Sequence, residues 1–123
     1  MAKTSKQIIP KRGEVYLVNF DPTIGSEIRK TRPAVILQND IANRYSAVTI
    51  VAALSSQFDD RLYPTEVLVE PVRGGIEKRS VILLDQIRTI DKQRLARKLG
   101  ILGPETLAKV DRALEISLGL VKI

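Results

Sequence analysis

Ala47-Val48-Thr49-Ile50-Val51-Ala52-Ala53-Leu54 is almost continuously apolar and rich in β-branched residues. A run of this length and composition is typical of a strand rather than a helix. Since neither of its two faces carries a regular polar stripe, both faces are expected to be buried. The run therefore predicts the central strand of a sheet, whose other strands come from the sequence on either side.

Four further runs predict those neighbouring strands. They are bounded by turn-forming residues and enriched in β-branched or aromatic side chains, and they cover residues 14–20, 34–38, 65–70 and 80–90. Pro33 is expected at the first position of the second run, where a missing N–H is tolerated. Residues 39–46, which contain Asn and Asp side chains that favour turns, are expected to form a loop.

Two helices are predicted after the last strand. Asp91 would cap a short helix over residues 92–99, which Gly100 would end. Pro104 suits the first turn of a final helix, one face of which is apolar through Leu107, Val110, Ala113, Leu114 and Leu118. Strands without intervening helices indicate antiparallel pairing. The sequence therefore predicts a mainly β fold with α, a small antiparallel β-barrel closed by a C-terminal helix.

The composition indicates one globular domain. The chain has 123 residues, of which 44% are hydrophobic and 28% charged, and residues 11–123 are expected to form the domain after a flexible tail at 1–10. No apolar run approaches the roughly 20 residues of a membrane span, and the N-terminus has no apolar core of a signal peptide. A cytoplasmic location without membrane contact is expected.

The chain contains no Cys and no His. These residues supply most transition-metal ligands and the commonest general base at neutral pH, so we expect no metal site, no cofactor and no serine–histidine–aspartate triad. Chemistry at neutral pH then depends on arginines, carboxylates and hydroxyls.

The net charge of +6 favours a polyanionic partner, although solubility alone explains such a charge about as well. The cations are unevenly spread along the chain. Residues 1–12 carry four cations and no acid, and residues 88–98 carry five cations against Asp91. This clustering tips the interpretation toward nucleic acid.

Arg32 is the first candidate site residue. Because it precedes Pro33, its backbone is restricted to extended conformations, and a guanidinium fixed in this way can bind a phosphate through two N–H groups. A surface pairing with Glu27 or Asp40 is an equally good interpretation of the same residue.

The connection before Arg32 carries further polar groups. Glu27 is either a general base or, more commonly in such a setting, a partner that balances its cationic neighbours. Gly25 and Ser26 offer backbone N–H and hydroxyl donors, which are weak indications by themselves.

Hydroxyls also follow the central strand. Ser55 and Ser56, with Gln57 next to them, can bind a phosphate or a base edge, although a local turn is the more common role for such residues. Tyr45, Phe58 and Tyr63 lie in expected loops, where aromatic rings can stack on unpaired bases. Together these groups would suit cleavage of single-stranded RNA by its own 2′-OH, because that reaction needs orientation and charge stabilisation but no protein nucleophile.

Four motifs, in this order, resemble those of the MazF/PemK family of toxins: Arg12-Gly13-Glu14-Val15, Asp21-Pro22-Thr23-Ile24-Gly25-Ser26-Glu27, Arg32-Pro33-Ala34-Val35-Ile36 and Asp85-Gln86-Ile87-Arg88-Thr89-Ile90. The resemblance covers about residues 11–120. It implies an SH3-like barrel, a homodimer in the cytoplasm, and a metal-independent, sequence-specific endoribonuclease that cleaves mRNA and leaves a 2′,3′-cyclic phosphate. It also implies a cognate MazE-like antitoxin as partner.

The resemblance assigns roles to single residues. The essential arginine of the family falls on Arg32, and its essential threonine, in a Thr-x-Gln pattern, falls on Ser55. This departure keeps the hydroxyl but loses the methyl group that restricts χ1. Glu27 matches a carboxylate that some members use in catalysis, and the expected RNA-binding residues are Gly25, Ser26, Ser56, Gln57, Tyr63, Asp85 and Gln86.

Two other functions remain open for a chain of this kind. One is a non-enzymatic, CcdB-like inhibitor of gyrase built on the same scaffold, and the other is a nucleic-acid-binding barrel without catalysis. The pairing of Arg32 with Ser55 favours the nuclease.

Overall fold

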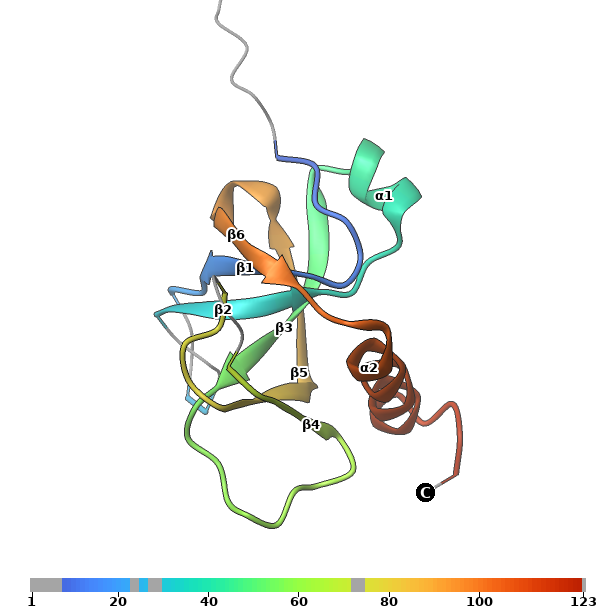
Figure 1. Cartoon of the computed structure of the whole chain (residues 1–123). Coiled ribbons are helices and arrows are strands. Elements are labelled where there is room, and N and C mark those ends of the chain that lie inside the picture. Colours follow the sequence, from blue (N-terminus) through green and yellow to red (C-terminus); the bar gives the residue numbers. More distant parts are fainter. Residues whose placement is uncertain (1–7, 23–24, 27–29, 72–74, 123) are drawn as a thin grey trace, which may run out of the picture.

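The computed structural model describes residues 8–22, 25–26, 30–71 and 75–122. In these ranges, six strands form one antiparallel sheet in the order β4-β5-β3-β2-β1-β6 (Figure 1). The strands are β1 Glu14–Asn19, β2 Thr31–Ile36, β3 Val48–Ser55, β4 Glu66–Val69, β5 Ser80–Asp91 and β6 Leu95–Ile101. The helices are α1 Asp40–Tyr45 and α2 Pro104–Ser117, with a 3₁₀ turn, η1, at Lys92–Arg94.

β3 is the central strand that its apolar run predicts. It lies between β5 and β2 in the sheet, and its residues from Val51 to Leu54 are each at most 2% exposed. Both faces are buried because each face carries its own hydrophobic cluster. The predicted two-sided burial of this strand is therefore confirmed.

The first hydrophobic cluster lies between the sheet and α2. Val35, Ala52 and Leu54 from the sheet pack there with Val110 and Ala113 of the helix. Leu107 and Leu114 pack against the edge of this cluster, whereas Leu118 follows the helix end and is 52% exposed. The predicted helix and its apolar face are confirmed except for that last leucine.

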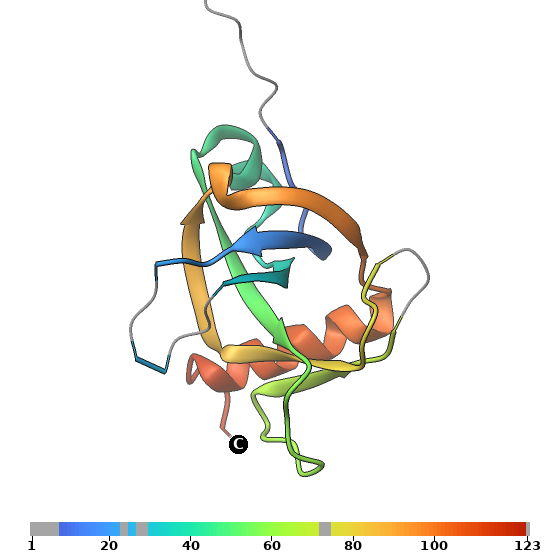
Figure 2. The same ribbon diagram turned by 90° about the vertical axis from the view of Figure 1, so that its left-hand side faces the viewer.

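The second cluster lies on the opposite face of the sheet. Val18, Phe20, Ala34 and Val51 are among its members, and Ile8 packs against it. The sheet is strongly curved, so that it bends around on itself (Figure 2). The predicted fold class, mainly β with α, is confirmed. No helix in the described ranges is both long and apolar enough to cross a bilayer.

The predicted helix at 92–99 is wrong. Asp91 does cap a turn, since its side chain accepts from Gln93 N at 2.8 Å, but the turn ends at Arg94 and β6 follows. β6 pairs along β1, from Glu14 opposite Ile101 to Val18 opposite Leu95. A short isolated helix is marginal in water, whereas pairing with β1 satisfies a whole row of backbone groups that would otherwise form an open edge.

Two smaller predictions also fail. The expected loop at 39–46 contains helix α1, because the Asn39 side chain accepts from Ala42 N at 2.8 Å and so acts as an N-cap rather than only as a turn former. Pro33 is the third residue of β2 rather than its first. It is tolerated there because the register between β2 and β3 begins only at Ala34, opposite Ala53.

Candidate active site

The start of β2 and the end of β3 place the two predicted catalytic residues at the same end of the sheet. Arg32 is the second residue of β2, and Ser55 is the last residue of the neighbouring antiparallel strand β3. β1 and β2 pair Val18 with Arg32, while the pairing of β2 with β3 begins at Ala34, opposite Ala53. Arg32 and Ser55 therefore lie just beyond the paired part of β2 and β3.

The Ser55 hydroxyl is held in a local turn. It donates to Gln57 O at 3.1 Å and accepts from Gln57 N at 3.2 Å, and Ser55 is 9% exposed. This is the turn-forming role that residue chemistry alone favours. To donate to a phosphate, the hydroxyl must rotate away from the Gln57 carbonyl.

Two arginines hold the base of the β1–β2 connection. Arg88 Nη1 donates to Phe20 O at 2.9 Å, and its guanidinium carbon lies 5.7 Å from the centre of the Phe20 ring. Arg94 Nη1 donates to Asn19 O at 3.0 Å and also to Asp21 O. The sequence analysis missed these roles, because a cation that binds backbone carbonyls leaves no pattern in the sequence.

The basic cluster at 88–98 is thus largely structural. Besides the two arginines above, Lys92 is 4% exposed and its Nζ donates to Asn43 O. Lys98 Nζ lies 2.7 Å from Glu14 Oε2. Of the five cations in this segment, Arg97 alone lines a cavity beside Arg32. Of these five cations, Arg97 is therefore the one that remains a candidate for contact with nucleic acid.

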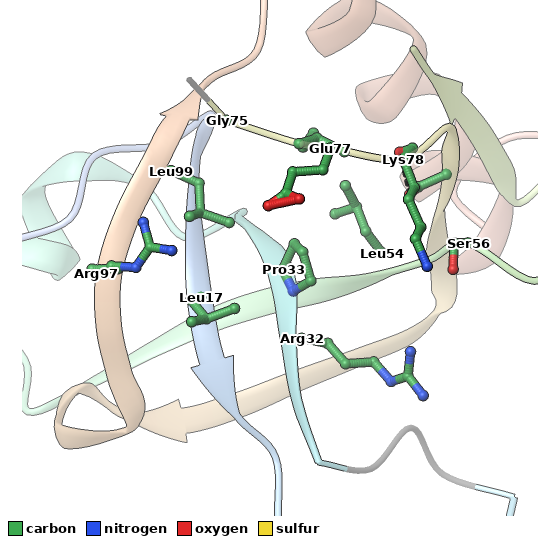
Figure 3. A pocket seen from close by; sticks show the side chains of 12 residues that line it. Leu17, Arg32, Pro33, Leu54, Ser56, Gly75, Glu77, Lys78, Arg97 and Leu99 are labelled. Carbon is green, nitrogen blue, oxygen red and sulfur yellow. Dashed lines mark hydrogen bonds between the residues drawn. The ribbon is translucent and has the colours of Figure 1, made fainter. Parts of the chain in front are cut away.

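A cavity of about 510 Å³ opens next to Arg32 (Figure 3). Its floor is apolar and its rim is charged. The lining comes from β1, β2, the end of β3 and the residue after it, the segment before β5 and its first residue, and β6. The residues are Leu17, Arg32, Pro33, Leu54, Ser56, Gly75, Ile76, Glu77, Lys78, Ser80, Arg97 and Leu99. Arg32 and Ser56 are the predicted site residues among them. The others were missed because segments far apart in the sequence build the cavity.

The remaining predicted RNA-binding residues lie outside this cavity. Gln57 and Tyr63 lie between β3 and β4, where Tyr63 is 68% exposed. Asp85 and Gln86 lie in β5 where its register with β3 shifts, between the pairs Ala52–Ile87 and Leu54–Ile82. They therefore lie where the regular pairing of these two strands is interrupted.

The β1–β2 connection is described only in part. Gly25 and Ser26 are exposed, and Gly25 has a φ of 60°, a conformation that glycine adopts readily. Glu27 lies outside the described residues. Asp40, the other suggested partner of Arg32, accepts instead from Arg12 N at 2.7 Å at the opposite end of β2.

A buried carboxylate lies away from this site. Glu14 is 7% exposed and accepts from Lys11 N at 2.7 Å in addition to its contact with Lys98. Burial, together with the nearby Glu14 carboxylate, raises the pKa of Tyr16. Within the described ranges, no three carboxylates lie close enough together to hold a metal ion.

Comparisons with known proteins agree with this geometry. The family model for PemK-like, MazF-like toxins of type II toxin–antitoxin systems matches residues 11–118. Endoribonuclease EndoA of Bacillus subtilis (strain 168) is 50% identical over 114 residues, which are 93% of this chain and 98% of that protein.

Solved structures give the same result. A mycobacterial endoribonuclease in complex with its cognate antitoxin is 28% identical, with a TM-score of 0.76 over 93% of this chain and 99% of that one. MazF from Deinococcus radiodurans is 29% identical, with a TM-score of 0.78 over 91% of this chain and 98% of that one. The chain therefore belongs to the family of PemK-like, MazF-like toxins of type II toxin–antitoxin systems.

Proposed function

We propose that the protein is the toxin of a type II toxin–antitoxin system and acts as an endoribonuclease on single-stranded mRNA. Its family membership and its 50% identity to a protein named as an endoribonuclease support this function. The finer parts of the proposal are that cleavage needs no metal, prefers certain sequences and leaves a 2′,3′-cyclic phosphate.

The position of Arg32 and Ser55 at the same end of the sheet carries the proposal. The ribose 2′-OH attacks the adjacent phosphorus, the bond to the 5′ oxygen breaks, and the leaving oxygen takes up a proton. Arg32 would stabilise the charge that develops on the phosphate and is the candidate proton donor to the leaving oxygen. The pairing of Arg32 with Val18 of β1 fixes its backbone before substrate arrives.

Ser55 and Glu27 have supporting roles in this mechanism. The Ser55 hydroxyl would bind the scissile phosphate once it rotates away from Gln57. Glu27 is the candidate general base for the 2′-OH, or else a partner that orders its own segment. Gly25, Ser26, Ser56, Gln57, Tyr63, Asp85 and Gln86 are proposed to contact the RNA on either side of the cleaved bond.

The proposed partners follow from the same family. Related structures show a mycobacterial endoribonuclease with its cognate antitoxin and a MazE–MazF complex from Deinococcus radiodurans. We propose that this toxin likewise binds a MazE-like antitoxin and forms a homodimer in the cytoplasm. Sedimentation of the free protein and of its mixture with the antitoxin measures both associations.

Incubation of the purified protein with mixed-sequence single-stranded RNA in EDTA tests the function. The proposal predicts fragments that end in a cyclic phosphate and start with a 5′-OH. Intact RNA with retarded mobility would indicate a binding protein without catalysis. Intact RNA with unchanged mobility, together with inhibition of gyrase, would indicate the CcdB-like alternative. Either of the last two results would overturn the proposal.

A further inference from the structure

Three charged side chains that line the 510 Å³ cavity have no partner among the described residues. Glu77, Lys78 and Arg97 all line it, and within the described part of the chain none of their side chains makes a hydrogen bond or ion pair. The neighbouring Arg79, one residue further along, does pair with Glu70 at 3.1 Å. The cavity thus keeps both hydrogen-bond donors and an acceptor available for a ligand.

The floor of the cavity has a different character. Leu17, Pro33, Leu54 and Leu99 present apolar surface, and the Glu77 carboxylate points in over Pro33 while Arg97 lies on the side of Leu99 (Figure 3). An apolar floor with polar groups around its edge suits a flat ligand with apolar faces and a hydrogen-bonding rim. A nucleobase has this construction, since its faces stack and its edges donate and accept.

Arg32 connects the cavity to the proposed site of cleavage. It lines the cavity, and it lies at the same end of the sheet as Ser55. A nucleotide whose phosphate contacts Arg32 therefore has its base next to the cavity opening. The positive charges of Lys78 and Arg97 on the same rim complement the phosphates of an RNA strand.

We propose that this cavity binds one unstacked base of the RNA strand, beside the cleaved phosphodiester, and that Glu77 reads its edge. The inference rests on the proposed function. A carboxylate accepts from the exocyclic amino group of adenine, cytosine or guanine, whereas uracil offers only its ring N3–H, flanked by two carbonyl oxygens that repel a carboxylate. The cavity therefore selects an amino-bearing base over uracil, and Arg97 donates to an acceptor on the base or to an adjacent phosphate.

An abasic scan tests the assignment. The cleavage site is first located by sequencing the products of the wild-type protein. An RNA of that sequence, blocked against cleavage by 2′-O-methyl groups, is then made with one abasic nucleotide at each position in turn, and its binding is followed by fluorescence anisotropy. The wild-type protein should lose about tenfold in affinity at the one position whose base occupies the cavity.

The variants Glu77→Gln and Arg97→Ala give the decisive comparison. Both should weaken binding of the intact RNA. At that same position the abasic substitution should then cost them only about threefold, because part of the base contact is already lost. In the wild-type protein, uracil at this position should weaken binding more than any amino-bearing base. In Glu77→Gln this difference should shrink, because an amide both donates and accepts.

Arg79→Ala is the matched control. It removes a cation from the same segment, from an exposed residue outside the cavity, and should keep the full tenfold loss at the selected position. If Arg97→Ala and Glu77→Gln give the same abasic profile as the wild type, the assignment of this cavity as a base-binding site is overturned. The proposed function would still stand in that case, provided that the wild type cleaves RNA. If the wild type neither cuts nor binds RNA, both proposals fail.

Discussion

The two ends of β2 differ in how they use polar side chains. At its C-terminal end, Gln38, Asn43, Thr49 and Lys92 bond one another or nearby backbone groups. Asn43 Oδ1 accepts from Gln38 Nε2 at 2.9 Å and from Thr49 Oγ1 at 2.7 Å, and Asn43 is completely buried. At the N-terminal end, Glu77, Lys78 and Arg97 surround a cavity without partners of their own among the described residues.

This contrast separates structural from functional polar groups. A buried polar network whose members satisfy one another stabilises the fold and leaves nothing for a ligand. Charged groups that stay unpaired around a cavity gain their partners only when something binds. The C-terminal end of β2 is therefore expected to control stability, and the N-terminal end to control RNA cleavage.

The largest expected effect is that of Arg32→Ala on cleavage. Removal of one preorganised group that stabilises transition-state charge typically costs 100-fold or more, so the cleavage rate should fall by at least about that factor. Arg32 is half-buried, so the unfolding free energy should fall by no more than about 1 kcal/mol. Single-turnover cleavage and urea denaturation measure the two quantities, with Arg79→Ala as the control that leaves both unchanged.

Asn43→Ala should have the opposite profile. It removes three side-chain hydrogen bonds, two accepted by Oδ1 and one donated to Gln38 O, and it leaves buried partners unsatisfied, so the unfolding free energy should fall by about 3 kcal/mol. Loss of the exposed cap in Asn39→Ala should cost only about 1 kcal/mol. Cleavage per folded molecule should remain normal for both variants. A stable Asn43→Ala protein would show that the network contributes little.

Ser55 tests whether a hydroxyl in a local turn also serves the substrate. Ser55→Ala should lower the cleavage rate about tenfold to 100-fold, whereas Ser55→Thr should stay within about threefold of the wild type because the hydroxyl is kept. Both rates are measured on one RNA substrate. An inactive threonine variant with an intact fold would count against the role assigned to Ser55 by the family resemblance.

Arg88 has a structural role that should also affect cleavage. Its side chain binds the base of the β1–β2 segment, which carries the proposed RNA-binding residue Ser26. Arg88→Ala loses its bond to Phe20 O and its ring contact, so the unfolding free energy should fall by about 1–2 kcal/mol. The cleavage rate should fall about tenfold through looser positioning. Arg112→Ala on α2 provides a control, and an unchanged rate in Arg88→Ala would remove the positioning role.

The smallest effect concerns the pH dependence of stability. Because the pKa of Tyr16 is raised in the folded state by burial and by Glu14, the neutral phenol is favoured by folding. The stabilisation that the neutral Tyr16 phenol gives the folded state is fully present below the unfolded pKa of about 10. It is lost as pH rises through the higher folded pKa. The unfolding free energy should therefore decline above about pH 10, and more steeply in the wild type than in Tyr16→Phe. Equal slopes would contradict this.

Local sequence signals predicted most of the fold. The apolar run of β3 and the stripe on α2 were correctly interpreted, because burial on both faces and helical spacing each leave a direct pattern. The failures at α1 and β6 have a common cause. Asn39 and Asp91 are capping residues that are compatible with a turn, a 3₁₀ turn or a helix, and in each case contacts with a distant segment, such as the pairing of β6 with β1, decide between them.

The site was predictable only in part for the same reason. Arg32 could be proposed from the sequence because Pro33 restricts its backbone and because the motifs around it resemble those of a family. Glu77 and Arg97 could not, since they meet only after β6 has paired with β1 and the segment before β5 has folded over the sheet. Glu77 and Arg97 are singled out because their side chains stay unpaired among the described residues, and no sequence pattern indicates which charged side chains stay unpaired.

The most direct test of the contrast between the two ends of β2 compares the cleavage rates of Arg32→Ala and Asn43→Ala. Both rates are measured on one RNA in EDTA, and each is divided by the folded fraction of its sample. The account predicts that Arg32→Ala is fully folded and at least about 100-fold slower, while Asn43→Ala is less stable but cuts at the wild-type rate per folded molecule. A folded Arg32→Ala protein that cuts RNA at nearly the wild-type rate would contradict it.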